Sequence, residues 1–524
     1  MNSGLRKQNF ETHIIHKPDT YLLISNTKCS KMSYFLVFFA AAALYILTCA
    51  PGAVWQDAGL IQYRVWHNDI EGKLGLALSH PLFYLIAIPF KYIPVDQYAY
   101  RINCLGAIIS AFAIANLFLL LRLWLGETFP ALLGAVTLAL SHTFWQHSTM
   151  PETYGLTAAL MFLELVMLLK YARTSRAVYL YLLAFINGLA VANHMLALIA
   201  FVCYFVLVIV LVIKKQLKMR HIIPMGLLWI TGALPYEYLI VKNIIQTHDI
   251  AGTLASALFG LKWEGAVLNT SLNLSVIKEN FLYLILNFPT PNILFLIVGA
   301  WSIYKFSPKR WFASVLIAMS ILFFIFAFRY TVPDRYTFFI PFYCLVSIFI
   351  GVGVFWYLLK GSEPHFIMFS IFCLVVVPAY YKAPEIARGL ELKIGNDRAI
   401  PYRNTSEYFL HPWKMNDNGA EQFALQALIS VELPAIIYAD ATAAPPLLLM
   451  QEERKLLAGQ DIKIISSIGT SEGAPEFNEQ TIDKLFSERN IYVVSNMKGY
   501  CPDFLLKRYK FEPEGVLWLA VKKE

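Results

Sequence analysis

Charged residues are scarce in this sequence. Of its 524 residues only 15% are Asp, Glu, Lys or Arg, whereas 58% are hydrophobic, and the mean hydropathy is +0.54. About a quarter of the residues of an average soluble protein are charged, so the composition excludes an ordinary soluble enzyme. The sequence also lacks internal repeats and low-complexity tracts, which excludes fibrous and disordered classes. The chain is therefore expected to be a polytopic membrane protein.

Cysteine pairs and glycine-rich turns are missing as well. The seven cysteines form no C-x-x-C motif, so the sequence gives no support for a metal site built on cysteine. The polar C-terminal part contains only Cys501 and cannot form a disulfide of its own. No G-x-G-x-x-G turn follows the first strand predicted there, where the chain reads Tyr438-Ala439-Asp440-Ala441-Thr442. Nucleotide binding by this part is therefore not expected.

Positive charge is concentrated in the first part of the chain. Residues 1–382 carry 27 Lys and Arg against 15 Asp and Glu, a net charge of +12, whereas residues 383–524 carry 16 against 20, a net charge of −4. Such an excess orients membrane spans more readily than it binds nucleic acid. Apolar runs that could cross a bilayer, some of them short for that purpose, lie near residues 32–50, 99–121, 129–145, 153–171, 178–192, 195–213, 222–241, 281–303, 311–328, 336–358 and 365–380.

One further apolar run, from His80 to Tyr92, is short and contains Pro81 and Pro89. We interpret it as a re-entrant or interfacial helix, because the basic joints between the other runs then all lie on the cytoplasmic side, as the positive-inside rule requires. About eleven spans result, with the N-terminus inside and the C-terminal part outside. If the run crosses instead, every later loop changes side.

The expected fold is a polytopic α-helical membrane protein with a small C-terminal α/β domain. Residues 1–31 form a cytoplasmic N-terminal segment, residues 32–381 a transmembrane domain whose first outer loop is 51–98, and residues 382–524 an extracytoplasmic domain. From Pro434 onward, strand-like and helix-like segments alternate, which favours a small parallel sheet. The predicted strands are 435–439, 462–468, 491–495 and 516–521, and the predicted helices are 445–457 and 480–489.

The first outer loop contains Asp57 and His80. Asp57 follows Trp55, which we place at headgroup level, so the carboxylate could act on a substrate whose tail lies in the lipid; an acid in a solvated loop or at a helix cap fits equally. His80 precedes Pro81 and could contact phosphate or carry a proton, or it could mark the start of a helix. Arg101, at the outer end of the next run, could also reach the headgroups by snorkelling.

Three later outer segments are rich in polar residues. The short hairpin after residue 145 ends in Glu152 and Tyr154, and Glu152 is a candidate second acid or a helix N-terminal charge. His194, next to Asn193, either turns the chain between two spans or lines a cavity. Arg329, Asp334 and Arg335 break the positive-inside pattern at an outer boundary. Guanidinium groups bind phosphate bidentately, so an anionic lipid headgroup is one partner and a loop-closing Arg–Asp pair is the alternative.

Together these segments resemble the GT-C superfamily of polytopic glycosyltransferases, and within it the DUF-type branch of protein O-mannosyltransferase-like membrane proteins. The similarity covers most of residues 32–440. Leu60 stands where that branch often has a glutamate, which argues against a paired-carboxylate or metal-assisted site, and Leu82 replaces a second proline. The matching motifs, in order along the chain, are Trp55–Gly59, His80–Pro81, Ser141–Trp145, Glu152–Tyr154, Gly188–Leu198 and Arg335–Pro341.

The resemblance implies an inverting glycosyltransferase that takes a sugar from a polyprenyl-phosphate donor at the extracytoplasmic face. Asp57 would be the catalytic base for an acceptor hydroxyl on a protein, glycan or lipid. Arg335, with Arg101 or Arg329, would stabilise the leaving phosphate. The cavity for sugar or phosphate would be lined by Glu152, His80 and His194.

Partners would be the lipid-linked donor, the acceptor and membrane lipids, in a bacterial inner membrane. The sequence indicates no definite cofactor; a divalent metal stays open but has no support in the sequence. Two other classes remain. A transporter or lipid flippase would use Arg335 and Glu164 along a translocation path, although the matched halves typical of transporters are not found. A non-enzymatic scaffold would present the C-terminal domain.

Overall fold

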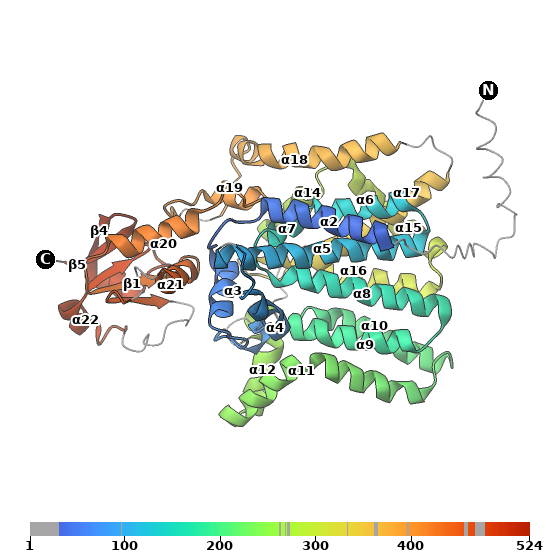
Figure 1. Cartoon of the computed structure of the whole chain (residues 1–524), viewed down its shortest axis with the longest axis horizontal. Helices are drawn as coiled ribbons and strands as arrows, with labels where there is room; N and C mark the ends of the chain where they lie inside the picture. The colour runs from blue at the N-terminus through green and yellow to red at the C-terminus, as the bar shows by residue number, and fades with distance from the viewer. Residues whose placement is uncertain are drawn as a thin grey trace, which may run out of the picture.

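The computed structural model describes residues 31–95, 97–260, 264–267, 269, 273–332, 334–360, 365–392, 394–395, 398–454, 459–466 and 477–523. Long helices run side by side, and a small sheet domain lies at one end of them (Figure 1). The principal helices of this bundle are α2 (Lys31–Thr48), α5 (Tyr98–Leu125), α6 (Thr128–Ala139), α8 (Thr153–Thr174), α9 (Val178–Asn193), α10 (Ala197–Ile213), α11 (Ile222–Thr247), α14 (Leu274–Asn287), α15 (Phe295–Phe306), α16 (Arg310–Arg329), α17 (Ile340–Leu359) and α18 (Phe366–Gly389).

A helix or a broken helix pair occupies each of the eleven predicted apolar runs. Among the described residues, six helical segments are long and apolar enough to cross a membrane. The pair of α14 and the segment Pro291–Phe306, bent by 111°, is either a seventh, broken span or a re-entrant loop. The others are shorter or less apolar, and the run 129–145 is divided between α6 and α7 (His142–Ser148). The predicted polytopic helical fold is confirmed, while the number of eleven spans stays a prediction.

Small residues allow close helix packing in the bundle. A Cβ added to Gly188 of α9 would overlap the carbonyl oxygen of Trp229, and one added to Gly232 of α11 would overlap that of Phe185. Glycine at such positions lets two backbones approach, which is how membrane helices gain packing energy without a hydrophobic driving force. The pair α9 and α11 is therefore fixed in register by two glycines.

The first outer loop enters and leaves the bundle at the same end. It contains α3 (Gln56–Trp66), the 3₁₀ turn η1 (Leu76–Leu78) and α4 (Pro81–Phe90). The Asn103 amide of α5 donates to the carbonyls of Ala50 (2.8 Å) and Gly52 (2.9 Å). The ten residues of α4 extend about 15 Å, half of a hydrocarbon core of roughly 30 Å. The helix α4 is too short to cross, in agreement with the interfacial interpretation.

The basic joints meet at the opposite end of the bundle. The indole of Trp124 donates to the carbonyl of Phe306 (2.9 Å), and the Arg173 guanidinium donates to the carbonyl of Trp124 (3.1 Å). These bonds join the ends of α5, α8 and α15, where Arg122, Arg173 and Lys305 lie. Positive charge and the sheet domain therefore occupy opposite ends of the helices.

The C-terminal domain contains a five-stranded sheet of order β2-β1-β3-β5-β4. The strands β1, β2 and β3 are parallel, whereas β5 is antiparallel to β3 and to β4. The prediction of a parallel sheet was therefore wrong for the last predicted strand, 516–521, which is β5 and forms an antiparallel hairpin with β4, a strand that was not predicted. The elements are α19 (Thr405–Leu410), α20 (Gly419–Ser430), β1 (Ala435–Ala439), α21 (Ala444–Glu453), β2 (Ile462–Ser466), α22 (Ile482–Glu488), β3 (Asn490–Val493), α23 (Asp503–Arg508), β4 (Tyr509–Glu514) and β5 (Leu517–Lys522). Residues 455–457 of one predicted helix and 467–468 of one predicted strand lie outside the described residues.

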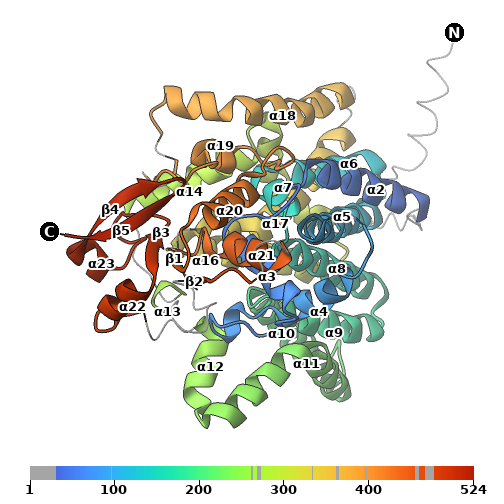
Figure 2. The same cartoon turned by 60° about the vertical axis from the view of Figure 1, so that its left-hand side comes forward.

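Alternating side chains cover the two faces of this sheet. On one face Ile436 and Ile491 pack with α22 and α23, and on the other Ile437 and Tyr492 pack with α20 and α21. The second face continues into the first outer loop, where Trp55 packs against Phe423 of α20 at a ring distance of 5.5 Å. Figure 2 shows α20 and α21 between the sheet and the helix bundle. The sheet domain and the first outer loop thus share one hydrophobic core.

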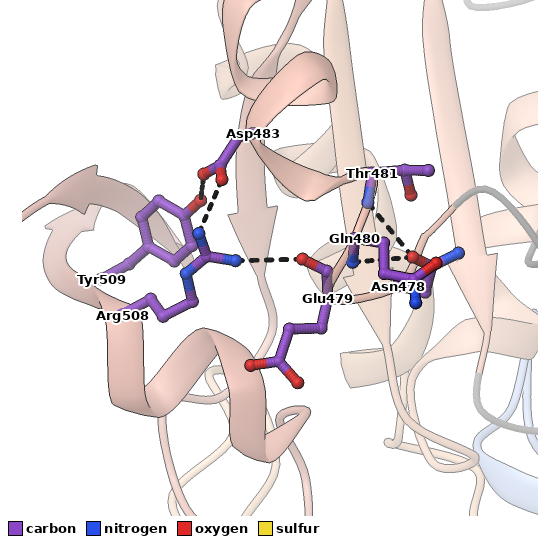
Figure 3. A network of polar contacts seen from close by, with 7 residues as sticks. All are labelled: Asn478, Glu479, Gln480, Thr481, Asp483, Arg508 and Tyr509. Carbon is purple, nitrogen blue, oxygen red and sulfur yellow. Dashed lines mark hydrogen bonds and ion pairs between the residues drawn. The ribbon is translucent and has the colours of Figure 1, made fainter.

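A polar network holds the outer layer of the domain together (Figure 3). Asp483 of α22 accepts hydrogen bonds from the Tyr509 hydroxyl (2.8 Å) and the Arg508 guanidinium (2.6 Å). The hydrogen bond from Tyr509, followed by Arg508, lowers the pKa of the Asp483 carboxyl. Arg508 also donates to the carbonyl of Glu479 (3.0 Å). The network ties α22 to the beginning of β4 on the side away from the bundle.

Candidate active site

A cavity of about 1050 Å³ lies where the sheet domain meets the helices. Its walls come from α3, the joint before α8, the joint between α9 and α10, the segment before α17, and the segment that joins α18 to the sheet domain. Six of the nine residues predicted for the site line it: Asp57, His80, Glu152, Tyr154, His194 and Asp334. Segments separated by up to 277 positions therefore converge on one space, as expected for side chains at the same end of neighbouring spans.

Asp57 is the second residue of α3. Gln56, directly before it, has a left-handed backbone with φ of 58°, which costs a non-glycine residue about 1–2 kcal/mol. The Asp57 side chain is accessible within the cavity, yet protein surrounds it, and this desolvation raises the pKa of its carboxyl. A helix N-terminus alone would favour the ionised form; here burial outweighs that effect. The strained turn presents a carboxyl whose proton affinity is increased.

The tryptophan near Asp57 lies elsewhere than predicted. Trp55 is 1% exposed and packs on Phe423 of the sheet domain. It is therefore not a headgroup-level anchor. Its ring packs in the core shared with the sheet domain and fixes the start of α3 against that domain.

His80 and His194 form a pair on the cavity wall. Their ring centroids lie 4.8 Å apart, and the Nδ1 of His80 lies 2.7 Å from the carbonyl oxygen of Asn193, which requires the proton on Nδ1. Burial lowers the pKa of His80 to about 4 and that of His194 well below its usual value. Both rings are therefore neutral at pH 7. His80 also has a left-handed backbone, with φ of 52°, at the N-terminus of α4.

Besides Glu279, which pairs with Arg335, three carboxyl groups line the cavity, namely Asp57, Glu152 and Asp334. Burial, followed by the charge of Asp57, raises the pKa of Asp334 to about 7. Burial and the charges of Asp57 and Asp334 raise the pKa of Glu152 well above its usual value. Like charges this close disfavour simultaneous ionisation, so the cluster holds protons near neutral pH. Perturbed acids in a cavity are typical of functional sites.

Tyr154 joins two parts of the wall. Its hydroxyl lies 2.8 Å from the Thr337 hydroxyl, and its ring lies 5.3 Å from that of His194 and 5.5 Å from that of His147. His147 also lines the cavity, and burial lowers its pKa to about 4. Tyr154 therefore connects the start of α8 to the segment before α17.

The three predicted arginines do not line the cavity. Arg101 donates to the carbonyl of Ile93. Arg329 donates to the carbonyls of Val267 (2.5 Å) and Asn269 (2.7 Å). Arg335 is 6% exposed and ion-pairs with Glu279, a residue of the cavity wall. Each guanidinium donates to a protein acceptor outside the predicted phosphate site.

Sequence reasoning missed three other arginines that do line the cavity, namely Arg64, Arg398 and Arg403. Arg64 lies seven residues after Asp57 on α3, a spacing that places both on one helix face, so the helical period could have identified it. Arg398 and Arg403 lie between α18 and α20, in a stretch with no hydrophobic period. Within the described part of the chain, no group of three His, Cys, Asp or Glu is arranged to hold a metal ion.

The cavity also has a large apolar part. It lies among α10, α12 (Ile250–Phe259), α14, α16 and α18, next to the polar groups. Apolar walls with a few convergent polar groups are the usual form of a ligand site. The residues that line this part include Leu198, Leu258, Leu282, Leu286, Phe326 and Ile386.

Comparison with solved structures gives the fold. The structure of ArnT from Cupriavidus metallidurans bound to undecaprenyl phosphate matches with a TM-score of 0.63 at 11% identity, covering 94% of this chain and 98% of that one. The chain has a GT-C fold. The mycobacterial arabinofuranosyltransferase AftD matches this chain with a TM-score of 0.50 at 11% identity, over 95% of this chain and 40% of AftD.

Sequence comparison gives a relative of part of this chain. Residues 76–218 match the family model described as the N-terminal domain of protein O-mannosyl-transferase TMEM260. The mouse protein O-mannosyl-transferase TMEM260 is 25% identical over 216 residues, 40% of this chain. That match spans 30% of the length of the mouse protein. It confirms the resemblance to O-mannosyltransferase-like GT-C proteins.

Proposed function

We propose that this protein is a membrane glycosyltransferase that transfers a sugar from a polyprenyl-phosphate donor to an acceptor hydroxyl, with inversion. The observation that carries the proposal is the accessible Asp57 carboxyl in a cavity that has both a polar and a large apolar part. The similarities to O-mannosyl-transferase TMEM260 and to ArnT bound to undecaprenyl phosphate support the same class of reaction. The acceptor belongs to a protein, a glycan or a lipid.

In this proposal Asp57 is the general base. Its carboxylate takes the proton of the acceptor hydroxyl while the hydroxyl oxygen bonds to the anomeric carbon of the sugar. The bond from that carbon to the phosphate oxygen breaks on the opposite face, and polyprenyl phosphate leaves with the electron pair. A base is most effective when its pKa lies near the working pH, and the raised pKa of Asp57 moves it in that direction.

The remaining polar groups would hold the sugar. Burial is the largest cause of the raised pKa values of Glu152 and Asp334. Near neutral pH these groups can therefore donate hydrogen bonds to sugar hydroxyls as well as accept hydrogen bonds from them. The neutral rings of His80 and His194 and the hydroxyl of Tyr154 add further partners. The apolar part of the cavity would take the first isoprene units of the donor.

The opposite placement of basic joints and cavity supports an outward-facing site. Positive joints remain on the cytoplasmic side of a membrane, so the end that carries the cavity and the sheet domain would be extracytoplasmic. In a bacterial inner membrane this is the periplasmic face. Donor lipids would then enter from the outer leaflet.

The transporter alternative receives no support from the two residues assigned to its path. Arg335 is paired with Glu279. Glu164 accepts hydrogen bonds from Asn187 (3.1 Å) and Tyr204 (3.0 Å) within the bundle and does not line the cavity. A buried carboxyl with two partners is explained by packing of α8, α9 and α10.

The proposal is tested with the purified full chain in lipid nanodiscs. We would supply radiolabelled polyprenyl-phosphate mannose, the first sugar to try given the resemblance to TMEM260, and a panel of protein and glycan acceptors, and compare them with nucleotide-activated mannose. Transfer from the lipid-linked donor, with inversion at the anomeric carbon, is expected. Transfer only from the nucleotide sugar, or uptake of label into sealed vesicles without bond formation, would contradict it.

A further inference from the structure

The cavity wall contains three arginines, and two of them are already neutralised by carboxylates. The Nε of Arg64 lies 3.5 Å from Asp69, and its Nη2 donates to the carbonyl of Ser79 (3.1 Å). Arg398 lies 2.5 Å from Asp440, and both side chains are buried. These two guanidinium groups have limited capacity for another anion.

Arg403 differs from the other two. Among the described residues, no carboxylate lies within ion-pair distance of it, and the one hydrogen bond of its side chain runs from Nη2 to the neutral amide oxygen of Gln56 (3.0 Å). Its Nε is buried without a hydrogen-bond partner, as are those of Arg64 and Arg398, so the missing carboxylate is what sets Arg403 apart. A guanidinium has five N–H donors, so most of its capacity is unused. A guanidinium on the cavity wall without a counter-charge points to an anionic ligand.

The position of Arg403 is fixed by aromatic rings. Its guanidinium carbon lies 4.4 Å from the ring centre of Tyr408 and 5.6 Å from that of Trp55. Cation–π contacts hold the planar group in one orientation. Such pre-organisation lowers the entropy that binding would cost.

Gln56 places this cation beside the proposed base. The residue after Gln56 is Asp57, and the backbone N–H of Gln56 donates to the carbonyl of Thr442 in the sheet domain (3.1 Å). The Thr442 amide in turn donates to Asp440 (2.9 Å). The contact between Gln56 and Arg403 therefore joins the first outer loop to the segment that follows α18.

We propose that Arg403 binds the phosphate of the lipid-linked donor, an inference that rests on the proposed function. The donor phosphate carries one negative charge before the reaction and two after the bond to the sugar breaks, so a guanidinium contact strengthens as the bond breaks. Arg403 thereby fills the role that sequence reasoning gave to Arg335, which Glu279 already neutralises.

Binding of undecaprenyl phosphate to the full chain in nanodiscs tests this role. We expect Arg403→Gln to weaken that binding about tenfold or more, Arg403→Lys to weaken it less, and neither to change binding of undecaprenol, which has no phosphate. The matched control is Arg388→Gln, on the exposed last turn of α18 outside the cavity. It removes one arginine near the same face and should leave the affinity unchanged.

The outcomes separate this inference from the proposed function. If the wild type does not bind undecaprenyl phosphate, the proposed function fails and the inference fails with it. If the wild type binds and Arg403→Gln binds equally well, or Arg388→Gln weakens binding as much, only the inference is overturned. Inorganic phosphate is the last probe. If Arg403→Gln weakens the binding of free phosphate but not that of undecaprenyl phosphate, the assignment to the lipid-linked donor is overturned. Unchanged undecaprenol binding shows that the variants are folded.

Discussion

The buried pair of Arg398 and Asp440 allows a quantitative prediction. The two side chains are 4% and 9% exposed and lie 2.5 Å apart. In Asp440→Asn the Arg398 guanidinium stays buried without its counter-charge. Its guanidinium carbon still lies 4.3 Å from the ring centre of Tyr500, a cation–π contact. Removing one partner of such a pair costs about 3–5 kcal/mol. Because 1.36 kcal/mol is a factor of ten, local opening of β1 should become roughly a hundred to several thousand times more frequent.

Hydrogen–deuterium exchange of the full chain measures this opening. Amides of β1 and β3 should lose protection in Asp440→Asn. The matched control is Asp461→Asn in the same domain, where the aspartate is 61% exposed and pairs with Arg489; an exposed pair is worth about 0–1 kcal/mol. Adding Arg398→Met to Asp440→Asn removes the unpaired charge and should restore part of the protection. Equal losses in the two single variants would refute the reasoning.

Two further predictions concern the first outer loop and the acid cluster. A Cβ at Gly59 would overlap the carbonyl oxygen of Val54, so Gly59→Ala should cost about 1–3 kcal/mol of stability and reduce sugar transfer by shifting α3. Thermal unfolding and the transfer assay measure the two effects. The control is Gly389→Ala, where a Cβ would meet open space; it should change neither stability nor transfer. The charge of Asp57 adds to burial in raising the pKa of Asp334, so Asp57→Asn should lower the pKa of Asp334 in an NMR titration of carboxyl-labelled protein. A pKa of Asp334 that stays in place or rises would show that the two carboxyls are not coupled.

Much of the fold was predictable because it depends on local patterns. The strand 435–439 has the predicted bounds, since its five residues are apolar and followed by a turn. The strand β4 was missed because Lys510, Glu512 and Glu514 make an edge strand look like a loop. The antiparallel pairing of β5 could not follow from alternation of strands and helices, because that pattern says nothing about a terminal hairpin.

The site was predictable only where chain position decides it. Asp57, in the first turn of α3, and His194, at the C-terminal end of α9, lie at the same end of the bundle, so a correct topology brings them together. The role of Arg335 depends on Glu279, 56 residues earlier, and no local pattern shows that contact. Arg403 was missed because its segment has no regular hydrophobic spacing that would place it on a helix or strand. Its lack of a carboxylate partner becomes visible only when its neighbours in the structure are known.

The most direct test of the account is the transfer rate of Asp57→Asn. Asparagine keeps the shape of the side chain and cannot take a proton, so single-turnover transfer from polyprenyl-phosphate mannose should fall by about 10²–10⁴-fold, while the affinity for undecaprenyl phosphate stays within a factor of a few. If Asp57→Asn transfers sugar at the wild-type rate, Asp57 is not the base, and the central claim is wrong.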